Sequence, residues 1–103
     1  MTRIISANLN GIRSANTKGF FILLATQNAD IVCVQELKAQ ADVVETAFAQ
    51  TTEHQGYFHY AEKKGYSGVG IYTRHTPDEV VAGFDGGEFD NEGRYVEARF
   101  GKL

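Results

Sequence analysis

The stretch Asp30-Ile31-Val32-Cys33-Val34-Gln35-Glu36 decides the fold. Its apolar centre is continuous and rich in β-branched residues, which is typical of a strand buried on both faces of a sheet. The strongly apolar segment Phe20–Ala25 comes before it and is expected to form a helix packed on that sheet. A first strand is expected at residues 3–8, where it ends in the polar segment Asn8-Leu9-Asn10-Gly11. The start of the chain therefore predicts the order strand, helix, strand.

The remainder of the chain predicts one more helix and several strands. Asp42-Val43-Val44-Glu45 has the spacing of a capping box, with Asp42 as the N-cap and a helix running to about Gln50. Residues 57–62 and 67–73 flank a Lys-Lys-Gly turn and are expected to pair as a hairpin. Further strands are expected at residues 79–83 and 95–100. This order indicates an α/β or α+β class, with one mixed sheet and covering helices.

The composition restricts the protein class. The chain has 103 residues, a length that suits one small domain. Its longest apolar stretch, Phe20–Ala25, is far shorter than the ~20 residues that span a bilayer, so no membrane partner is expected. The start of the chain lacks the apolar region and cleavage site of a secretory signal. A single cysteine excludes an internal disulfide, and Cys33 is expected to be a buried core thiol in a reducing cytoplasm.

Charge is unevenly distributed along the chain. Lys and Arg number 10 against 13 Asp and Glu, and the net charge of −3 by itself disfavours a nucleic-acid partner. Residues 1–26 and 63–75, however, contain basic residues and no acid. Local patches, and not the sum, set the field that a ligand meets. Ordinary surface variation explains the same pattern and is the preferred interpretation from charge alone.

Asn8 and Glu36 are the first candidates for chemistry. Each is a polar side chain at the carboxyl end of an apolar strand, and ligand sites in open α/β sheets gather at such strand ends. A lone carboxylate suits a hard cation such as Mg²⁺, and an amide beside it can orient a phosphate or the carboxylate. An alternative is equally compatible with the spacing: Asn8 caps a turn, and Glu36 pairs with Lys38 on a loop.

The segment Gly65-Tyr66-Ser67-Gly68-Val69-Gly70-Ile71-Tyr72 is the second candidate. Glycine inside a strand marks the close approach of another backbone or of a ligand, and two lysines precede this segment. The segment is suited to presenting amides and an aromatic ring to a phosphate backbone. Taken alone, crowding by a neighbouring helix is the simpler interpretation. The three histidines lack the paired spacing of a metal site, and the sequence contains no P-loop or CxxC motif.

Four motifs occur in order along the chain. They are Ile4-Ile5-Ser6-Ala7-Asn8-Leu9-Asn10-Gly11-Ile12-Arg13, Asp30-Ile31-Val32-Cys33-Val34-Gln35-Glu36-Leu37-Lys38, Gly65-Tyr66-Ser67-Gly68-Val69 and Glu92-Gly93-Arg94. Together they resemble the amino-terminal part of the exodeoxyribonuclease III group, the bacterial apurinic/apyrimidinic endonucleases of the endonuclease/exonuclease/phosphatase family. The Asn-x-Asn-Gly-Ile-Arg and Gln-Glu-x-Lys forms favour the DNA-repair branch over the lipid-phosphatase branches. The resemblance implies the first half of a two-sheet α/β sandwich with the site at one end.

The resemblance also implies roles for individual residues. Glu36 matches the metal-ligand glutamate and Asn8 an active-site asparagine near metal and phosphate, so these two are the expected catalytic residues and metal ligands. Asn10 stands where relatives carry Asn or Asp near the metal, and its lack of charge makes it a weaker ligand. The residues expected on the DNA-contacting surface are Arg13, Lys38, Tyr66 and Arg94, with Lys38 also close to the metal carboxylate. The implied ion is Mg²⁺, with Mn²⁺ as the alternative.

The implied activity is that of a DNA-repair nuclease. Such an enzyme hydrolyses the DNA backbone 5′ to abasic sites, degrades DNA from 3′ to 5′ and removes 3′ phosphates, so its partner is duplex DNA with abasic sites or 3′ ends. Family members are considerably longer, and their later motifs are absent here. The chain is therefore expected to be incomplete and inactive alone, and to need its missing carboxyl-terminal half or to self-associate. Two alternatives stay open: a catalytically silent half-domain that is structural or binds DNA weakly, and a phosphodiesterase of the same superfamily acting on a small or lipid phosphate.

Overall fold

The computed structural model describes residues 2–83 and 91–101. Within these residues the elements follow the order β1 (Ile4–Asn8), α1 (Ile12–Thr17), α2 (Phe20–Ala25), β2 (Ile31–Gln35), α3 (Ala41–Ala47), β3 (Gln55–His59), β4 (Val69–Thr73), β5 (Glu79–Ala82) and β6 (Val96–Arg99). The strands and the two helices expected from the sequence are present, with shifts of one to a few residues at their ends. Helix α1 was not expected.

A four-stranded mixed sheet forms the centre of the molecule. Its strands lie in the order β1-β2-β4-β3, with β1 parallel to β2 and with β4 antiparallel to both β2 and β3. Two adjacent parallel strands need a crossover connection, and α1 and α2 supply it. The mixed, helix-covered sheet predicted from the sequence is confirmed.

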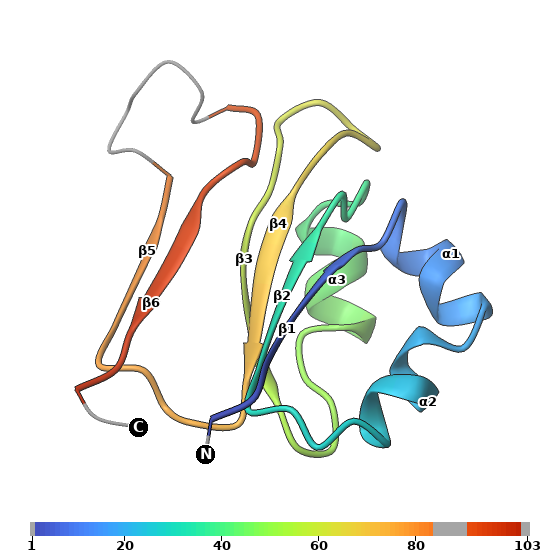
Figure 1. Cartoon of the computed structure of the whole chain (residues 1–103). Coiled ribbons are helices and arrows are strands. Elements are labelled where there is room, and N and C mark those ends of the chain that lie inside the picture. The colour runs from blue at the N-terminus through green and yellow to red at the C-terminus, as the bar shows by residue number, and fades with distance from the viewer. Residues whose placement is uncertain (1, 84–90, 102–103) are drawn as a thin grey trace.

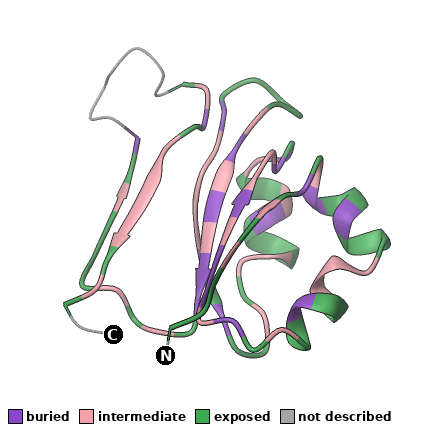
Figure 2. Cartoon of the chain, in the orientation of Figure 1, coloured by how far each residue is buried: buried purple, intermediate pink, exposed green. Residues whose placement is uncertain are grey.

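Helices and a second, two-stranded sheet flank the central sheet. Helices α1, α2 and α3 lie on one face, and the β5–β6 hairpin lies on the other side, next to β3 and β4 (Figure 1). The core sits between the central sheet and the helices, as the distribution of buried residues shows (Figure 2). Its fully buried members include Ile12, Val32, Val34, Val44 and Tyr72. None of the helices in the described part of the chain is long and apolar enough to cross a membrane.

The glycine at position 70 serves packing. A Cβ added at Gly70 would lie 2.4 Å from an edge carbon of the Phe58 ring, which already packs edge-on against Tyr72. Phe58 belongs to the neighbouring strand β3 and not to a helix. Crowding by a neighbouring element therefore explains this glycine, but the neighbour is a strand and not the helix that was expected.

Two local expectations need correction. Asp42 is not an N-cap: α3 begins at Ala41 after Gln40, Asp42 lies in the first turn, and the helix ends at Ala47 instead of near Gln50. Cys33 is half-buried and does not belong to the core cluster, because it alternates with the core residues Val32 and Val34 along β2. Burial still raises the pKa of the Cys33 thiol, so the thiol stays protonated at neutral pH.

Candidate functional site

The ends of β1 and β2 bring the two expected catalytic side chains into contact. The strands run parallel, and Asn8 pairs with Gln35, so Glu36 follows at the same edge of the sheet. The Asn8 side-chain amide donates a hydrogen bond to Glu36 Oε2. The backbone continues the pairing beyond the strands, since the Gly11 amide donates to the Glu36 carbonyl at 2.8 Å. The juxtaposition predicted from the strand ends is therefore present.

Lys38 and Asn10 complete a polar cluster with these two residues. The Lys38 ammonium lies 2.5 Å from Asn10 Oδ1 and 3.7 Å from Glu36 Oε1. Asn8 Oδ1 accepts a hydrogen bond from the Asn10 amide at 3.0 Å. Asn8 thus caps a turn and Glu36 pairs with Lys38, as the alternative interpretation held. The contact between Asn8 and Glu36 and the contacts of the alternative interpretation are therefore present together.

Four chain segments lie side by side at this edge, and we call them the site edge: residues 8–12, 36–38, 66–68 and 92–94. Backbone hydrogen bonds connect the first two segments, from Ile12 N to Leu37 O at 2.8 Å. The second and third are connected from Lys38 N to Ser67 O at 2.7 Å, and the third and fourth from Gly68 N to Gly93 O at 3.0 Å. Segments far apart in the sequence therefore form one continuous surface.

The backbone of the site edge is conformationally unusual. Asn10, Glu36, Lys38 and Ser67 have φ between 45° and 54°. Non-glycine residues rarely adopt this left-handed conformation, and residues held in it cluster at functional sites. The site edge contains four of the five non-glycine residues with positive φ in the described part of the chain, the fifth being Asn28.

Tyr66 and Arg94 form the second part of the site edge. Arg94 Nη2 donates a hydrogen bond to the Tyr66 hydroxyl at 2.7 Å, and the guanidinium carbon lies 5.5 Å from the centre of the Tyr66 ring. The Lys63 ammonium lies 5.4 Å from the same ring centre. Hydrogen bonds from Arg94 to the Glu92 carboxylate and then to Tyr66 raise the pKa of Arg94. Arg13 lies exposed in the first turn of α1, two residues after Gly11.

The donor atoms of the cluster suit a hard divalent cation. Glu36 supplies a partly exposed carboxylate, and Asn8 and Asn10 supply amide oxygens. The Lys38 ammonium lies between Asn10 Oδ1 and the Glu36 carboxylate, so both oxygens face a positive charge. Mg²⁺ in proteins is typically held by one or two carboxylates, with water and phosphate oxygens completing its shell. Among the described residues, no group of three or more His, Cys, Asp or Glu side chains could hold a metal. Within the polar cluster around Asn8, Glu36 supplies the carboxylate.

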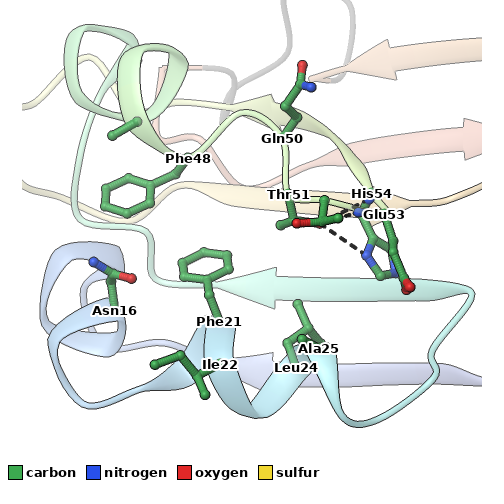
Figure 3. A pocket seen from close by; sticks show the side chains of 12 residues that line it. Asn16, Phe21, Ile22, Leu24, Ala25, Phe48, Gln50, Thr51, Glu53 and His54 are labelled. Carbon is green, nitrogen blue, oxygen red and sulfur yellow. Dashed lines mark hydrogen bonds between the residues drawn. The ribbon is translucent and has the colours of Figure 1, made fainter.

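Two hollows in the described part of the surface differ in chemistry. A smaller one of about 270 Å³ borders Asn8 and Leu9 and is otherwise lined by residues of α1, α2 and the turn between them. The larger, of about 760 Å³, lies between α2 and the segment after α3 (Figure 3). Its walls include the stacked rings of Phe21 and Phe48, 5.7 Å apart, and no residue of the site edge lines it. His54, which borders this pocket, has its Nε2 within 2.8 Å of the Ala29 carbonyl oxygen.

Two residues that support the site edge were not identified from the sequence as functional. Glu92 was noted only as part of a motif, yet its carboxylate accepts a hydrogen bond from Arg94 Nε at 2.9 Å. Gln40 contacts the turn before Tyr66: its side chain donates to the Lys63 carbonyl at 2.8 Å and accepts from the Gly65 amide at 3.1 Å. The signal for Glu92 is its spacing, an acid and an arginine separated by a single glycine. Gln40 has no such signal, because its partners lie more than 20 residues away.

Comparison with known proteins identifies relatives of this chain. The model of the Endonuclease/Exonuclease/phosphatase family matches residues 5–103. An exodeoxyribonuclease of Bacillus subtilis is 37% identical over 99 residues, and a DNA-(apurinic or apyrimidinic site) endonuclease of Dictyostelium discoideum is 30% identical over 98 residues. These matches cover 95% of this chain but 38% and 27% of the relatives.

Solved structures agree with the sequence matches. An AP endonuclease from Archaeoglobus fulgidus superposes with a TM-score of 0.80 at 29% identity, over 98% of this chain and 38% of that one. A Neisseria 3′ phosphatase bound to a product DNA hairpin superposes with the same TM-score at 27% identity, with the same coverage of both chains. The fold expected from the motifs is confirmed, and the chain spans well under half of these relatives.

Proposed function

Because the chain belongs to the Endonuclease/Exonuclease/phosphatase family, we propose that it supplies the metal carboxylate and part of the DNA surface of a DNA-repair nuclease. The observation that carries the proposal is the contact between Asn8 and Glu36 at the ends of two parallel strands. The similarity to exodeoxyribonuclease and AP endonucleases supports DNA as the substrate. The whole protein then hydrolyses phosphodiesters 5′ to abasic sites and degrades DNA from its 3′ ends.

The candidate residues at and beside the site edge have distinct roles in this proposal. Glu36 holds the divalent cation with help from Asn8 and, more weakly, from the uncharged Asn10. Lys38 balances the charge of Glu36, from which it is 3.7 Å distant. Arg13, Lys38, Tyr66 and Arg94 contact the DNA backbone, where arginine forms charge-assisted hydrogen bonds to phosphate. The cation, Mg²⁺ with Mn²⁺ as the alternative, supplies Lewis-acid stabilisation of the developing phosphate charge.

The proposal extends to the domain and its location. We propose that residues 1–103 form the amino-terminal part of a longer family domain, in line with their 38% coverage of the Bacillus relative. We propose the cytoplasm as its location, a reducing compartment in which a single thiol such as that of Cys33 stays free. The same coverage favours a second candidate for the chain taken alone, a catalytically silent half that binds DNA weakly.

The test is cleavage of a labelled duplex that carries one abasic site. Two proteins are assayed in parallel: the longer protein that is proposed to contain this sequence, and residues 1–103 alone. Each is assayed with Mg²⁺, with Mn²⁺ and with EDTA. EDTA is expected to abolish cleavage, and Glu36→Gln to reduce it about 100-fold or more, since Lewis-acid stabilisation contributes several kcal/mol. Asp42→Asn is the matched control, because Asp42 is an exposed acid outside the site edge. Full activity of Glu36→Gln would remove the role assigned to Glu36.

Two further arms of this test separate the alternatives. Binding of residues 1–103 to the duplex without cleavage supports the silent half-domain, and robust cleavage by residues 1–103 refutes it. A phosphoinositide assayed beside the DNA tests the third candidate. Turnover of the lipid without turnover of DNA would overturn the proposed nuclease function.

A further inference from the structure

Glu92 is an acid at a surface proposed to bind phosphate. Its side chain is about one-third exposed, and its Oε1 accepts a hydrogen bond from Arg94 Nε at 2.9 Å. Arg94 is thereby held from two sides, because its Nη2 donates to the Tyr66 hydroxyl at 2.7 Å. A negative charge would repel DNA if Glu92 faced it alone, so its presence needs another reason.

We propose that Glu92 is a positioning residue, which fixes the Arg94 guanidinium against Tyr66 so that cation and ring meet a DNA phosphate together. This inference rests on the proposed function of the site edge. It adds that the arrangement of Arg94 and Tyr66 depends on an acid that itself does not contact DNA. An ordered guanidinium loses less side-chain entropy on binding than a free one.

Backbone contacts hold the segment that carries Glu92. Glu92 pairs with Ala61 in an isolated bridge, and the Glu62 amide donates to the Asn91 carbonyl at 2.9 Å. Gly93 has a φ of 63°, and a Cβ added there would lie 2.3 Å from the Ala61 amide nitrogen. Position 93 therefore accepts only glycine. The segment is held against the chain after β3 on one side and against Gly68 on the other.

The charges around Tyr66 give Glu92 a second reason to be there. The Lys63 ammonium and the Arg94 guanidinium lie 5.4 Å and 5.5 Å from the centre of one ring. Two cations attracted to the same ring repel each other, and both interactions with the ring are modest at an exposed site. The carboxylate of Glu92 offsets part of this repulsion and directs Arg94 to the hydroxyl edge of Tyr66.

The direction in which Glu92→Ala changes DNA affinity distinguishes a positioning role from that of an ordinary surface acid. If Glu92 is only a surface acid, Glu92→Ala removes repulsion and tightens DNA binding. If it positions Arg94, the same change weakens binding, and we expect a loss of about tenfold, the lower end of what a hydrogen bond to a charged group contributes. Glu92→Gln retains an acceptor for Arg94 Nε but loses the charge that offsets the repulsion from Lys63, so its affinity is expected to lie between those of Glu92→Ala and the unchanged protein.

The chain contains a matched control for this experiment. On β6, Arg99 Nε donates to Glu97 Oε2 at 2.8 Å, with the same spacing of two residues. Glu97→Ala breaks an equivalent pair outside the site edge and should leave DNA affinity unchanged. In an Arg94→Ala background, Glu92→Ala should cause no further weakening, because its effect passes through Arg94. Binding to a fluorescent 20-base-pair duplex is measured by anisotropy, and circular dichroism checks that each variant is folded.

A second readout does not depend on DNA. The Nε–H signal of Arg94 in ¹⁵N NMR should show a rigid side chain in the unchanged protein and in Glu92→Gln, and a mobile one in Glu92→Ala. Tighter DNA binding by Glu92→Ala, further weakening in the Arg94→Ala background, or an equally mobile Arg94 in all proteins would each overturn the inference. If no variant binds DNA while Arg94 is rigid only with an acceptor at position 92, the proposed function fails and the ordering of Arg94 by Glu92 stands.

Discussion

Ser67 shares the left-handed backbone of the charged residues at the site edge, although no chemistry is assigned to it. Its φ is 45°, and its carbonyl accepts the hydrogen bond from the Lys38 amide. A side chain at such a φ costs about 1–2 kcal/mol relative to glycine. Hydrogen bonds to the neighbouring segments offset this cost, because they hold the backbone of residues 67 and 68 beside Lys38 and Gly93. The site edge therefore stores strain in several residues at once.

This strain predicts that Ser67→Gly stabilises the protein. Glycine adopts the left-handed conformation freely but loses more entropy on folding, so the net gain in the free energy of unfolding should be about 0.5–1 kcal/mol. Urea denaturation followed by circular dichroism measures it. Ser14→Gly, at an exposed position of α1, is the control and should destabilise by about the same amount. Loss of stability in Ser67→Gly would show that the backbone at this position is not strained.

At the scale of elements, the sequence predicts the strands better than the helices. The β-branched run of β2 makes its burial evident, and the parallel β1 then places Asn8 beside Glu36. Helix α1 has no such pattern: it spans six residues, includes the weak helix formers Ser14, Asn16 and Thr17, and has no side-chain cap. Tertiary contacts make it helical, since Ile12 is fully buried and its amide donates to Leu37.

The start of α3 shows how a distant contact overrides a local pattern. Asp42 and Glu45 have the spacing of a capping box, but Gln40 takes the N-cap position without capping the helix through its side chain. That side chain instead binds the turn at residues 63–65. A contact between residues so far apart leaves no trace in local spacing. The same reason explains why the contact of Arg94 with Tyr66, 28 residues away, was not predicted.

The packing of β3 on β4 yields a prediction for Gly70. A Cβ there would meet the Phe58 ring at 2.4 Å, so Gly70→Ala must displace that ring from Tyr72. We expect a loss of about 1–3 kcal/mol in the free energy of unfolding, the usual cost of overpacking. Phe58→Leu alone should also destabilise, but the double variant should lose clearly less than the sum of the two. Additive losses in a double-mutant cycle would contradict the proposed clash.

Asp30 joins the starts of β1 and β2 to the end of β4, and its carboxylate predicts a pH dependence. The Arg3 amide donates to Asp30 Oδ2 at 2.8 Å, and His75 Nε2 lies 2.9 Å from Oδ1. The bond from Arg3 and then that from His75 lower the pKa of Asp30 below its ordinary value of 3.8. A lowered pKa stabilises the fold above that value, and the stabilisation disappears as the pH falls through the folded-state pKa.

Asp30→Asn should therefore lower the urea midpoint at pH 7, and the difference from the unchanged protein should shrink below about pH 4. Parallel urea titrations between pH 3 and pH 7 measure this difference. Asp78→Asn, at an exposed position in the turn before β5, is the control for the general effect of removing a carboxylate. A difference that stays constant over this range would show that ionised Asp30 does not fasten the three strands.

At the scale of the whole molecule, the second face of the central sheet is covered unevenly. The β5–β6 hairpin lies next to β3 and β4, whereas β1 is an edge strand whose Ile4 is 61% exposed. The apolar side chains of α2 give a second exposed patch, since Ile22 is 79% and Leu23 is 59% exposed. An exposed edge strand pairs readily with another chain, and exposed apolar patches favour association.

We therefore predict that the 103-residue chain self-associates through β1. Ile4→Lys places a charge on the edge strand, where lysine discourages pairing, and should raise the concentration needed for association about tenfold. Ile22→Lys removes an apolar side chain of equal size from α2 and is the matched control. It should have a smaller effect, because α2 offers no unpaired backbone groups to a second chain. Light scattering after size exclusion over a range of concentrations measures both. A monodisperse monomer at every concentration would refute self-association. A larger effect of Ile22→Lys would show that the chains associate through α2 and not through β1.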